Sequence, residues 1–199
     1  MLLLNKLIDQ KMKKVILYIS LSAIVLSACN NSPKSDSETA NKTDQSATTT
    51  EAGTSTSAIS GIVNGYLQLS DALAQDNDKD AAEAGKNIVA AMNGLDKSSF
   101  SAEQTELYSE IEEGSKEHAE HISKNVGNIK HQREHFDMLS KDVYDLVKSV
   151  GGGQTLYVAN CPMYNKNKGA NWLTASKEIK NPYMGTAMLK CGTIKEELQ

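Results

Sequence analysis

The sequence has little that would suit an all-β fold, a nucleic-acid partner or a membrane-spanning body. Aromatic residues make up 5% of its 199 residues and proline occurs 3 times, which disfavours a β-sandwich. Acidic residues (25) outnumber lysine and arginine (21), and no basic stripe is present that could neutralise phosphates, so we expect no nucleic-acid partner. After the first 28 residues, no apolar run reaches the length that a membrane-spanning helix requires.

Signatures of several enzyme classes are missing as well. The sequence contains no GxGxxG motif, no P-loop, no HExxH motif and no internal repeat of fixed period. Its cysteines form no CxxC pair, and no set of nucleophile, base and acid can be recognised. We therefore expect a protein that is not an enzyme.

The N-terminal segment is typical of an exported lipoprotein. Lysines precede an apolar run over residues 15–26, which is followed by Ser-Ala-Cys at residues 27–29. The run is too short to cross a bilayer and suits the apolar part of a signal peptide. Small residues followed directly by cysteine resemble the bacterial lipobox, in which the cysteine becomes the lipidated first residue of the mature protein. We predict a lipoprotein signal peptide over residues 1–28 and membrane anchoring through acylated Cys29.

Residues 29–57 are predicted to form the lipidated, disordered tether of the mature chain. They are rich in Ser, Thr and Asn and contain almost no large apolar residue, so they cannot bury enough surface to fold. Met1 and Met12 are alternative starts for the signal peptide that precedes the tether. Asn30 is not the acidic residue associated with inner-membrane retention, so we expect a location at the outer membrane, facing the periplasm.

Apolar residues recur at helical spacing from residue 58 and predict four amphipathic helices within residues 58–153. Ser101 and Gln104 form a capping box at the third helix, and Gly127 with Asn128 suits the boundary between the third and the fourth. The four stripes are Ile59, Ile62, Tyr66, Leu69 and Leu73; Ala81, Gly85, Ile88, Met92 and Leu95; Leu107, Ile111, His118, Ile122, Asn125 and Ile129; and Ile129, Gln132, Phe136, Leu139, Val143, Leu146 and Val150. Short connections between these helices predict an all-α fold, an up-down four-helix bundle.

Residues 154–199 differ in character and are predicted to form an irregular lobe, packed on the bundle as part of one domain. Residues 155–163 begin as a short strand, and residues 188–194 are its candidate partner in a short β-hairpin. The long loop between them has little secondary structure of its own and needs an attachment that holds it.

Cys161 and Cys191 are the two cysteines that remain once Cys29 carries lipid, and two interpretations of them stay open. In an oxidising compartment they form a structural disulfide, which closes a loop of about 30 residues and contributes about 3–4 kcal/mol. Alternatively, their thiolates bind a metal ion together with the thioethers of Met163 and Met188. Such soft ligands select Cu(I). The two states can alternate, because an oxidised pair cannot bind the ion.

The fourth helix carries further candidate ligands. His131 and His135, with Met138, are spaced i, i+4 and i+7 beside the apolar face, and imidazoles four residues apart on a helix can chelate copper or zinc. The alternative is a solvated flank of the helix. On the third helix we expect His118 to be a core histidine with a satisfied hydrogen bond and His121 to be exposed.

A combination of short motifs links the C-terminal half to a known family. The motifs are residues 131–136 (HQREHF), 139–140 (LS), 156–158 (LYV), 161–163 (CPM), 169–170 (GA), 172–173 (WL), 178–179 (EI), 181–183 (NPY), 185 (G), 188–189 (ML) and 191–192 (CG). Over about residues 59–196 the chain resembles a small domain of unknown function from Gram-negative bacteria. That domain occurs in exported lipoproteins and at the C-terminus of periplasmic adaptor subunits of RND copper and heavy-metal efflux pumps. The resemblance implies periplasmic metal handling without enzymatic activity.

These features lead to one hypothesis and one alternative. The hypothesis is a membrane-anchored periplasmic lipoprotein that binds copper, or a related soft heavy metal, for buffering or delivery to an efflux adaptor or pump. The proposed ligands are Cys161, Met163, Met188 and Cys191, with His131 and His135 as secondary candidates. The alternative is a non-enzymatic interaction module of the cell envelope, in which Cys161 and Cys191 form a structural disulfide.

Overall fold

The structure is a computed structural model that describes residues 57–199. The predicted signal peptide, Cys29 and almost all of the predicted tether lie outside the described residues. Within residues 57–199, no helix is both long enough and apolar enough to cross a membrane.

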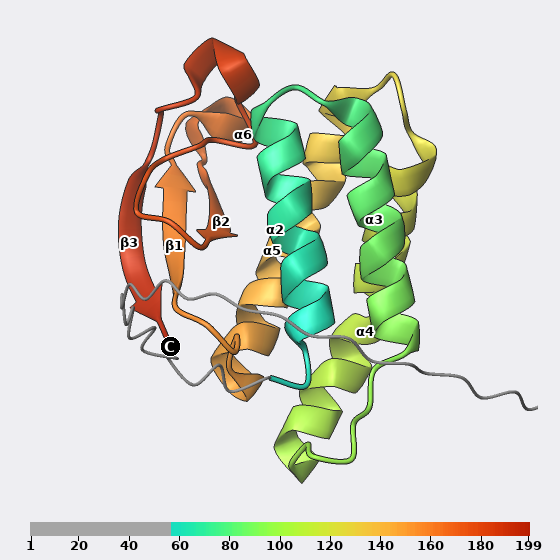
Figure 1. Ribbon diagram of the computed structural model, residues 1–199. Coiled ribbons are helices and arrows are strands. Elements are labelled where there is room, and N and C mark those ends of the chain that lie inside the picture. Colours follow the sequence, from blue (N-terminus) through green and yellow to red (C-terminus); the bar gives the residue numbers. More distant parts are fainter. Residues whose placement is uncertain (1–56) are drawn as a thin grey trace, which may run out of the picture. The chain divides into compact units, whose positions relative to one another are not determined.

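Most of the described chain is helical, and four long helices follow one another along the sequence (Figure 1). They are α2 (Ser60–Ala74), α3 (Asp78–Asn93), α4 (Ala102–Lys124) and α5 (Ile129–Val150). Each packs against the next, and α5 also contacts α2 and α3. The predicted helix starts are confirmed: Ser101 and Gln104 complete a capping box, and the backbone N–H of His131 donates to Asn128 Oδ1.

The core contains the apolar stripes predicted for α2 and α5, but the buried face of α4 coincides with the predicted stripe only at Ile122. The buried residues of α4 are Tyr108, Ser115, Ala119 and Ile122, whereas Leu107, Ile111 and His118 are only partly buried. The reason is close helix packing. A Cβ atom at Gly85 of α3 would lie 2.7 Å from the carbonyl oxygen of Ala119, so the absence of a side chain at Gly85 lets α3 and α4 pack closely here.

The C-terminal segment, predicted to be an irregular lobe with a short β-hairpin on an all-α fold, forms a three-stranded sheet instead. Strands β1 (Leu156–Cys161), β2 (Ala170–Thr174) and β3 (Thr193–Leu198) form an antiparallel sheet in the order β2-β1-β3. A C-terminal partner of β1 was predicted over residues 188–194, but the strand begins only at residue 193. β2 was predicted to be loop; it is a strand that packs against α5 and α2, because Trp172 and Leu173 are buried there.

A buried tyrosine attaches the sheet to the helices. The hydroxyl oxygen of Tyr66 on α2 accepts the backbone N–H of Leu173 on β2 at 3.1 Å. The same hydroxyl lies 2.7 Å from Ser140 Oγ on α5, and the Tyr66 ring stacks on Phe136 with 5.2 Å between centroids. These contacts hold β2 against both helices at once.

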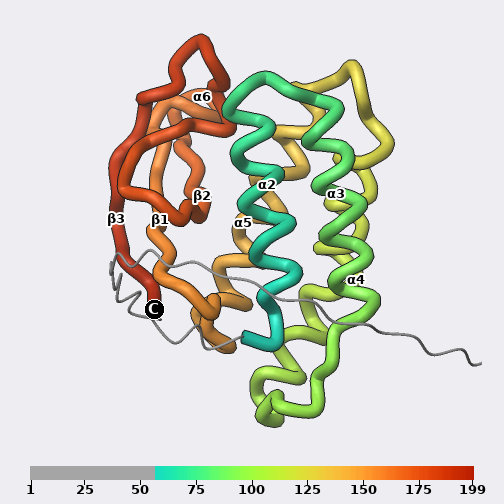
Figure 2. The backbone as a smooth tube through the Cα atoms, in the orientation of Figure 1, coloured from blue at the N-terminus to red at the C-terminus, as the bar shows by residue number. Residues whose placement is uncertain are grey.

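The remaining elements are short and lie in the connections of the sheet. Helix α6 (Tyr164–Asn167) joins β1 to β2, and the 3₁₀ helix η1 (Gly185–Met188) precedes β3. Between β2 and η1 lies Asn181, which is fully buried; its Oδ1 accepts two backbone N–H groups and its Nδ2 donates to the carbonyl oxygen of Cys191. Figure 2 shows the loop that holds η1 beside the turn between α2 and α3. This region thereby positions Cys191.

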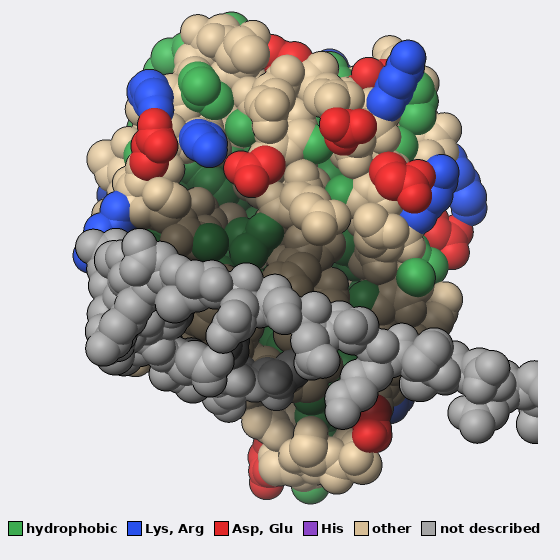
Figure 3. Space-filling model, in the orientation of Figure 1, with side chains coloured by type: hydrophobic (Ala, Val, Ile, Leu, Met, Phe, Trp, Pro, Cys, Tyr) green, Lys and Arg blue, Asp and Glu red, His purple; other side chains and the backbone are tan. Residues whose placement is uncertain are grey.

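Charged side chains on the face drawn in Figure 3 are interspersed, with lysine and arginine close to aspartate and glutamate. Ion pairs between residues three or four apart recur on the helices, such as Lys86 with Glu83 at 2.9 Å and Lys116 with Glu112 at 2.6 Å. Pairs of this kind contribute little to the stability of the fold.

Candidate metal centres

All four histidines of the chain meet on one helical hairpin. His118 and His121 lie on α4, while His131 and His135 lie on α5, and we call this group the four-histidine cluster. The geometry of the hairpin explains why the histidines lie close together. Its turn lies between residues 124 and 129, and His118 and His135 are equally far from the centre of this turn along the sequence. His121 and His131 are at nearly equal distances from it. The two helices therefore bring the histidines together in pairs.

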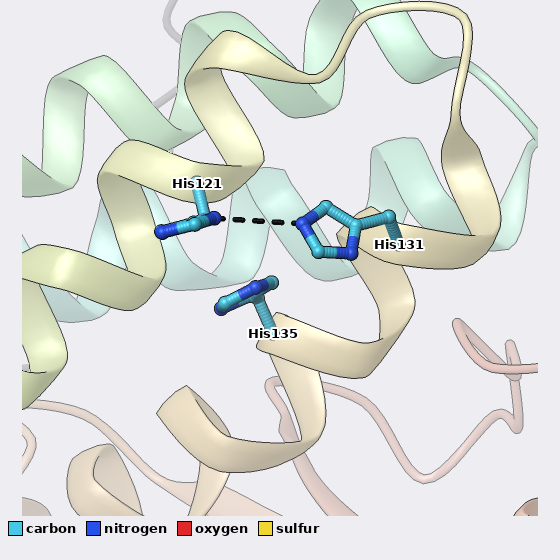
Figure 4. A group of neighbouring side chains, drawn as sticks. All are labelled: His121, His131 and His135. Carbon is cyan, nitrogen blue, oxygen red and sulfur yellow. Dashed lines mark hydrogen bonds between the residues drawn. The ribbon is translucent and has the colours of Figure 1, made fainter.

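Short contacts between ring nitrogens define the cluster. Nδ1 of His118 lies 3.2 Å from Nδ1 of His135, and Nε2 of His131 lies 3.4 Å from Nδ1 of His121. The rings of His121 and His135 stack with 4.2 Å between centroids. Figure 4 shows His121, His131 and His135 gathered between the two helices. One ring nitrogen from each of these three residues lies within 4.8 Å of the other two.

The surroundings favour the neutral form of two of these rings. Burial, together with the neighbouring histidines, lowers the pKa of His135 to about 4. Burial also lowers the pKa of His118, although the nearby Asp142 carboxylate opposes this effect. Asp142 is itself held by Ser115, whose Oγ donates to it at 2.8 Å, and burial raises its pKa. A neutral imidazole keeps the lone pair that a metal ion needs.

Two of the four histidines differ from their sequence-based predictions. His118 was predicted to be a core histidine with a satisfied hydrogen bond; it has a hydrogen-bond partner, the ring of His135, but it is only half-buried. His121 was predicted to be exposed; 45% of its side chain is exposed, and the rest stacks on His135. His131 and His135 lie together, 4.5 Å between centroids. The missed signal was the spacing of the histidines about the turn between two antiparallel helices.

Cys161 and Cys191, the cysteine pair, meet although 30 residues separate them along the chain. Their Sγ atoms are 3.9 Å apart, and both are free thiols. Cys161 is the last residue of β1 and is fully buried, whereas Cys191 lies between η1 and β3 and is half-buried. Burial and the neighbouring Cys161 thiol raise the pKa of Cys191 above its ordinary value. A thiol with a raised pKa is a weak nucleophile at neutral pH.

Both predicted methionine ligands lie close to one cysteine of the pair along the chain. Met163, two residues after Cys161, is 47% exposed. Met188 ends η1, and its carbonyl oxygen accepts the backbone N–H of Cys191 at 3.0 Å. Gly192, which follows Cys191, packs closely against Trp172: a Cβ atom there would lie 2.8 Å from the Trp172 ring. The structure brings the two cysteines together, and the role of the methionines as ligands stays a prediction.

The helical part that carries the histidines also has a relation to a known family. Residues 62–155 match a family model described as a protein of unknown function (DUF3347). The match extends from α2 to just beyond α5, so it contains all four histidines and ends before both cysteines. The predicted resemblance to a domain of unknown function is confirmed over these residues, while the relation to efflux adaptors stays a prediction. No curated protein and no solved structure matches the chain.

Proposed function

We propose that the protein is a membrane-anchored periplasmic lipoprotein that binds copper, or a related soft heavy metal. The observation that carries the proposal is the 3.9 Å separation of the Cys161 and Cys191 sulfurs. With metal–sulfur bonds of about 2.3 Å, this separation corresponds to a sulfur–metal–sulfur angle of about 116°, between the tetrahedral and trigonal values. Two thiolates at this spacing suit a single ion, and soft sulfur ligands favour Cu(I) over harder ions.

Further ligands come from the residues next to the pair. Met163 and Met188 each lie within three residues of a cysteine, and their thioethers would complete a sulfur-only ligand set. His131 and His135 remain secondary candidates for copper, since they lie on α5 and belong to the four-histidine cluster. The partial exposure of Met163 gives the ion a route from solvent.

In this proposal, the rest of the chain supports the metal site and determines where in the cell envelope the protein is located. Helices α2 to α5 form an up-down four-helix bundle that supports the sheet and the segment leading to Cys191. Acylated Cys29 holds this domain at a membrane, with the outer membrane as the expected one, facing the periplasm. There the protein buffers the ion or delivers it to an efflux adaptor or pump component, without catalysing a reaction.

The proposal predicts tight Cu(I) binding that depends on the sulfur ligands. Reduced full-length protein is titrated with Cu(I) against a chromogenic Cu(I) chelator under anaerobic conditions. Cys161→Ser and Met188→Leu should each lower the affinity at least about tenfold, because each removes a soft ligand. Met92→Leu, which changes a buried methionine of α3, is the matched control and should bind as the wild type does. If both ligand variants keep the wild-type affinity, the cysteine pair is not the copper site.

A second candidate function rests on the same sulfur distance. A shift of the two side chains would join sulfurs that are 3.9 Å apart, and the resulting disulfide would fasten the segment between β2 and β3 to the sheet. The protein would then be a non-enzymatic interaction module of the cell envelope. Mass spectrometry of protein from the periplasm, alkylated with and without prior reduction, distinguishes the two. Alkylation at both cysteines without reduction favours the metal site, and alkylation only after reduction favours the module.

A further inference from the structure

The four-histidine cluster offers a ligand set that differs in kind from the cysteine pair. It consists only of imidazoles, and it lies on α4 and α5 rather than on the sheet. Each imidazole lies next to another imidazole: ring nitrogens are 3.2 Å apart in one pair, His118 with His135, and 3.4 Å apart in the other, His121 with His131. Imidazole nitrogens suit zinc and other divalent transition metals, while Cu(I) prefers sulfur. The cluster therefore suits a divalent ion, in contrast to the Cu(I) proposed for the thiols.

We propose that His121, His131 and His135 bind one divalent transition-metal ion of the zinc class, and that His118 positions His135 for it. Bonds of about 2.0–2.1 Å in a tetrahedral zinc site place ligand nitrogens about 3.4 Å apart. His121 Nδ1 and His131 Nε2 already lie 3.4 Å apart. The nitrogens of all three residues lie within 4.8 Å, a spread that rotation of these half-buried rings can close.

His118 acts on the site through His135. A hydrogen bond between the two Nδ1 atoms, at 3.2 Å, leaves Nε2 of His135 as its ligand atom. Behind His118 stands Asp142, whose charge acts on the His118 ring and whose carboxylate accepts the hydroxyl of Ser115 at 2.8 Å. Metal-binding histidines commonly have such a partner on the second nitrogen, because it fixes the tautomer and the ring orientation.

A buried amide fixes the two helices that carry the ligands. Gln132 of α5 is fully buried, next to His131 in the sequence, and its Nε2 donates to the carbonyl oxygens of Ile122 at 3.1 Å and Asp78 at 2.9 Å. These bonds set the register of α5 against the end of α4. His131 and His121 keep 32% and 45% of their side chains exposed, so an ion can reach the site from solvent. The ligands are thus positioned by the fold and still accessible.

Binding of Co²⁺ and Zn²⁺ tests the proposal. Reduced full-length protein is titrated anaerobically with Co²⁺, whose visible spectrum reports ligand type and geometry, and Zn²⁺ is then added in competition. We expect one Co²⁺ per chain, no thiolate-to-cobalt charge-transfer band, and displacement by Zn²⁺. His131→Gln and His135→Gln should each weaken binding at least about tenfold, and His118→Gln should weaken it about tenfold and shift the Co²⁺ spectrum.

Two control variants keep the outcome unambiguous. Lys130→Gln changes an exposed neighbour of His131 and should bind Co²⁺ as the wild type does. The double variant Cys161→Ser/Cys191→Ser should keep Co²⁺ and Zn²⁺ binding while losing Cu(I), which separates this site from the proposed copper function. The proposal is overturned if neither ion binds, if Co²⁺ binding shows the charge-transfer band of a thiolate and is lost in this double variant, or if His131→Gln, folded by circular dichroism, binds Co²⁺ with unchanged affinity.

Discussion

Asp76, in the turn between α2 and α3, connects the parts of the molecule that hold Cys191 in place. Its carboxylate accepts hydrogen bonds from Arg133 of α5 at 2.6 Å and from the backbone N–H of Thr186 in η1 at 2.9 Å. Arg133 also donates to backbone oxygens of residues 73 and 182, at 2.7 Å each. One charged pair therefore ties α2, α5 and the segment between β2 and β3 together.

Asp76→Asn should lower the free energy of unfolding by about 1 kcal/mol at neutral pH, and this loss should vanish in acid. Asparagine tolerates the positive φ of residue 76 (56°), so the substitution removes the charge and keeps the turn. Hydrogen bonds from Arg133 and Thr186 lower the pKa of Asp76 to about 2. Because the folded-state pKa lies below the unfolded one, the stabilisation is complete above about pH 4 and disappears as the pH falls to about 2.

Denaturant unfolding of the wild type and Asp76→Asn across this pH range measures the difference. Other carboxylates titrate in both proteins, so only the gap between the two stabilities reports on Asp76. A gap that stays the same between pH 7 and pH 2 would contradict the role assigned to the Asp76 charge.

At the level of elements, the helices could be predicted because their signals are local. The capping box at Ser101 and the Asn128 cap involve residues next to the start of α4 and of α5. The apolar stripes of α2 and α5 are long and regular. The prediction of the buried face of α4 was correct only at Ile122, because that face depends on packing against α3. Gly85 of α3 lets the backbone at Ala119 come close, and no pattern within α4 announces that contact.

The sheet was harder to predict because its pairing is non-local. β3 has the sequence TIKEEL, whose lysine and glutamates suit a helix as well as a strand, and among its residues only Leu198 is buried. It is an edge strand paired with β1 alone, and charged side chains are common on such edges. Its partner lies more than 30 residues earlier, so only the folded chain defines the pairing.

In the candidate metal centres, too, the local features could be predicted and the contacts between helices could not. Counting cysteines was enough to predict that Cys161 and Cys191 meet, since no other described cysteine competes for either of them. His131 and His135 could be predicted as neighbours because they lie one turn apart on one helix. His118 and His121 join the four-histidine cluster because α4 packs against α5. The sequence of either helix alone does not predict this packing.

For the molecule as a whole, the two candidate centres lie on separate structural parts with separate chemistry. The four-histidine cluster belongs to the α4–α5 hairpin, whose nitrogen ligands suit a divalent ion of the zinc class. The cysteine pair joins the end of β1 to the segment before β3, and its sulfur ligands suit Cu(I). Oxidation affects only the second, so the redox state of the compartment should control one site and leave the other unchanged.

Oxidation of the cysteine pair to a disulfide should raise the free energy of unfolding by about 3–4 kcal/mol and abolish Cu(I) binding. The bond would close a loop of 30 residues, which restricts the denatured chain, and it would consume both thiolates. Denaturant unfolding and metal titration of oxidised and reduced full-length protein measure both effects, and Co²⁺ binding at the four-histidine cluster should not change. The double variant Cys161→Ser/Cys191→Ser should show no response to the oxidant. If the oxidised protein is no more stable than the reduced one, or still binds Cu(I) with the affinity of the reduced protein, the cysteine pair does not couple stability to metal binding.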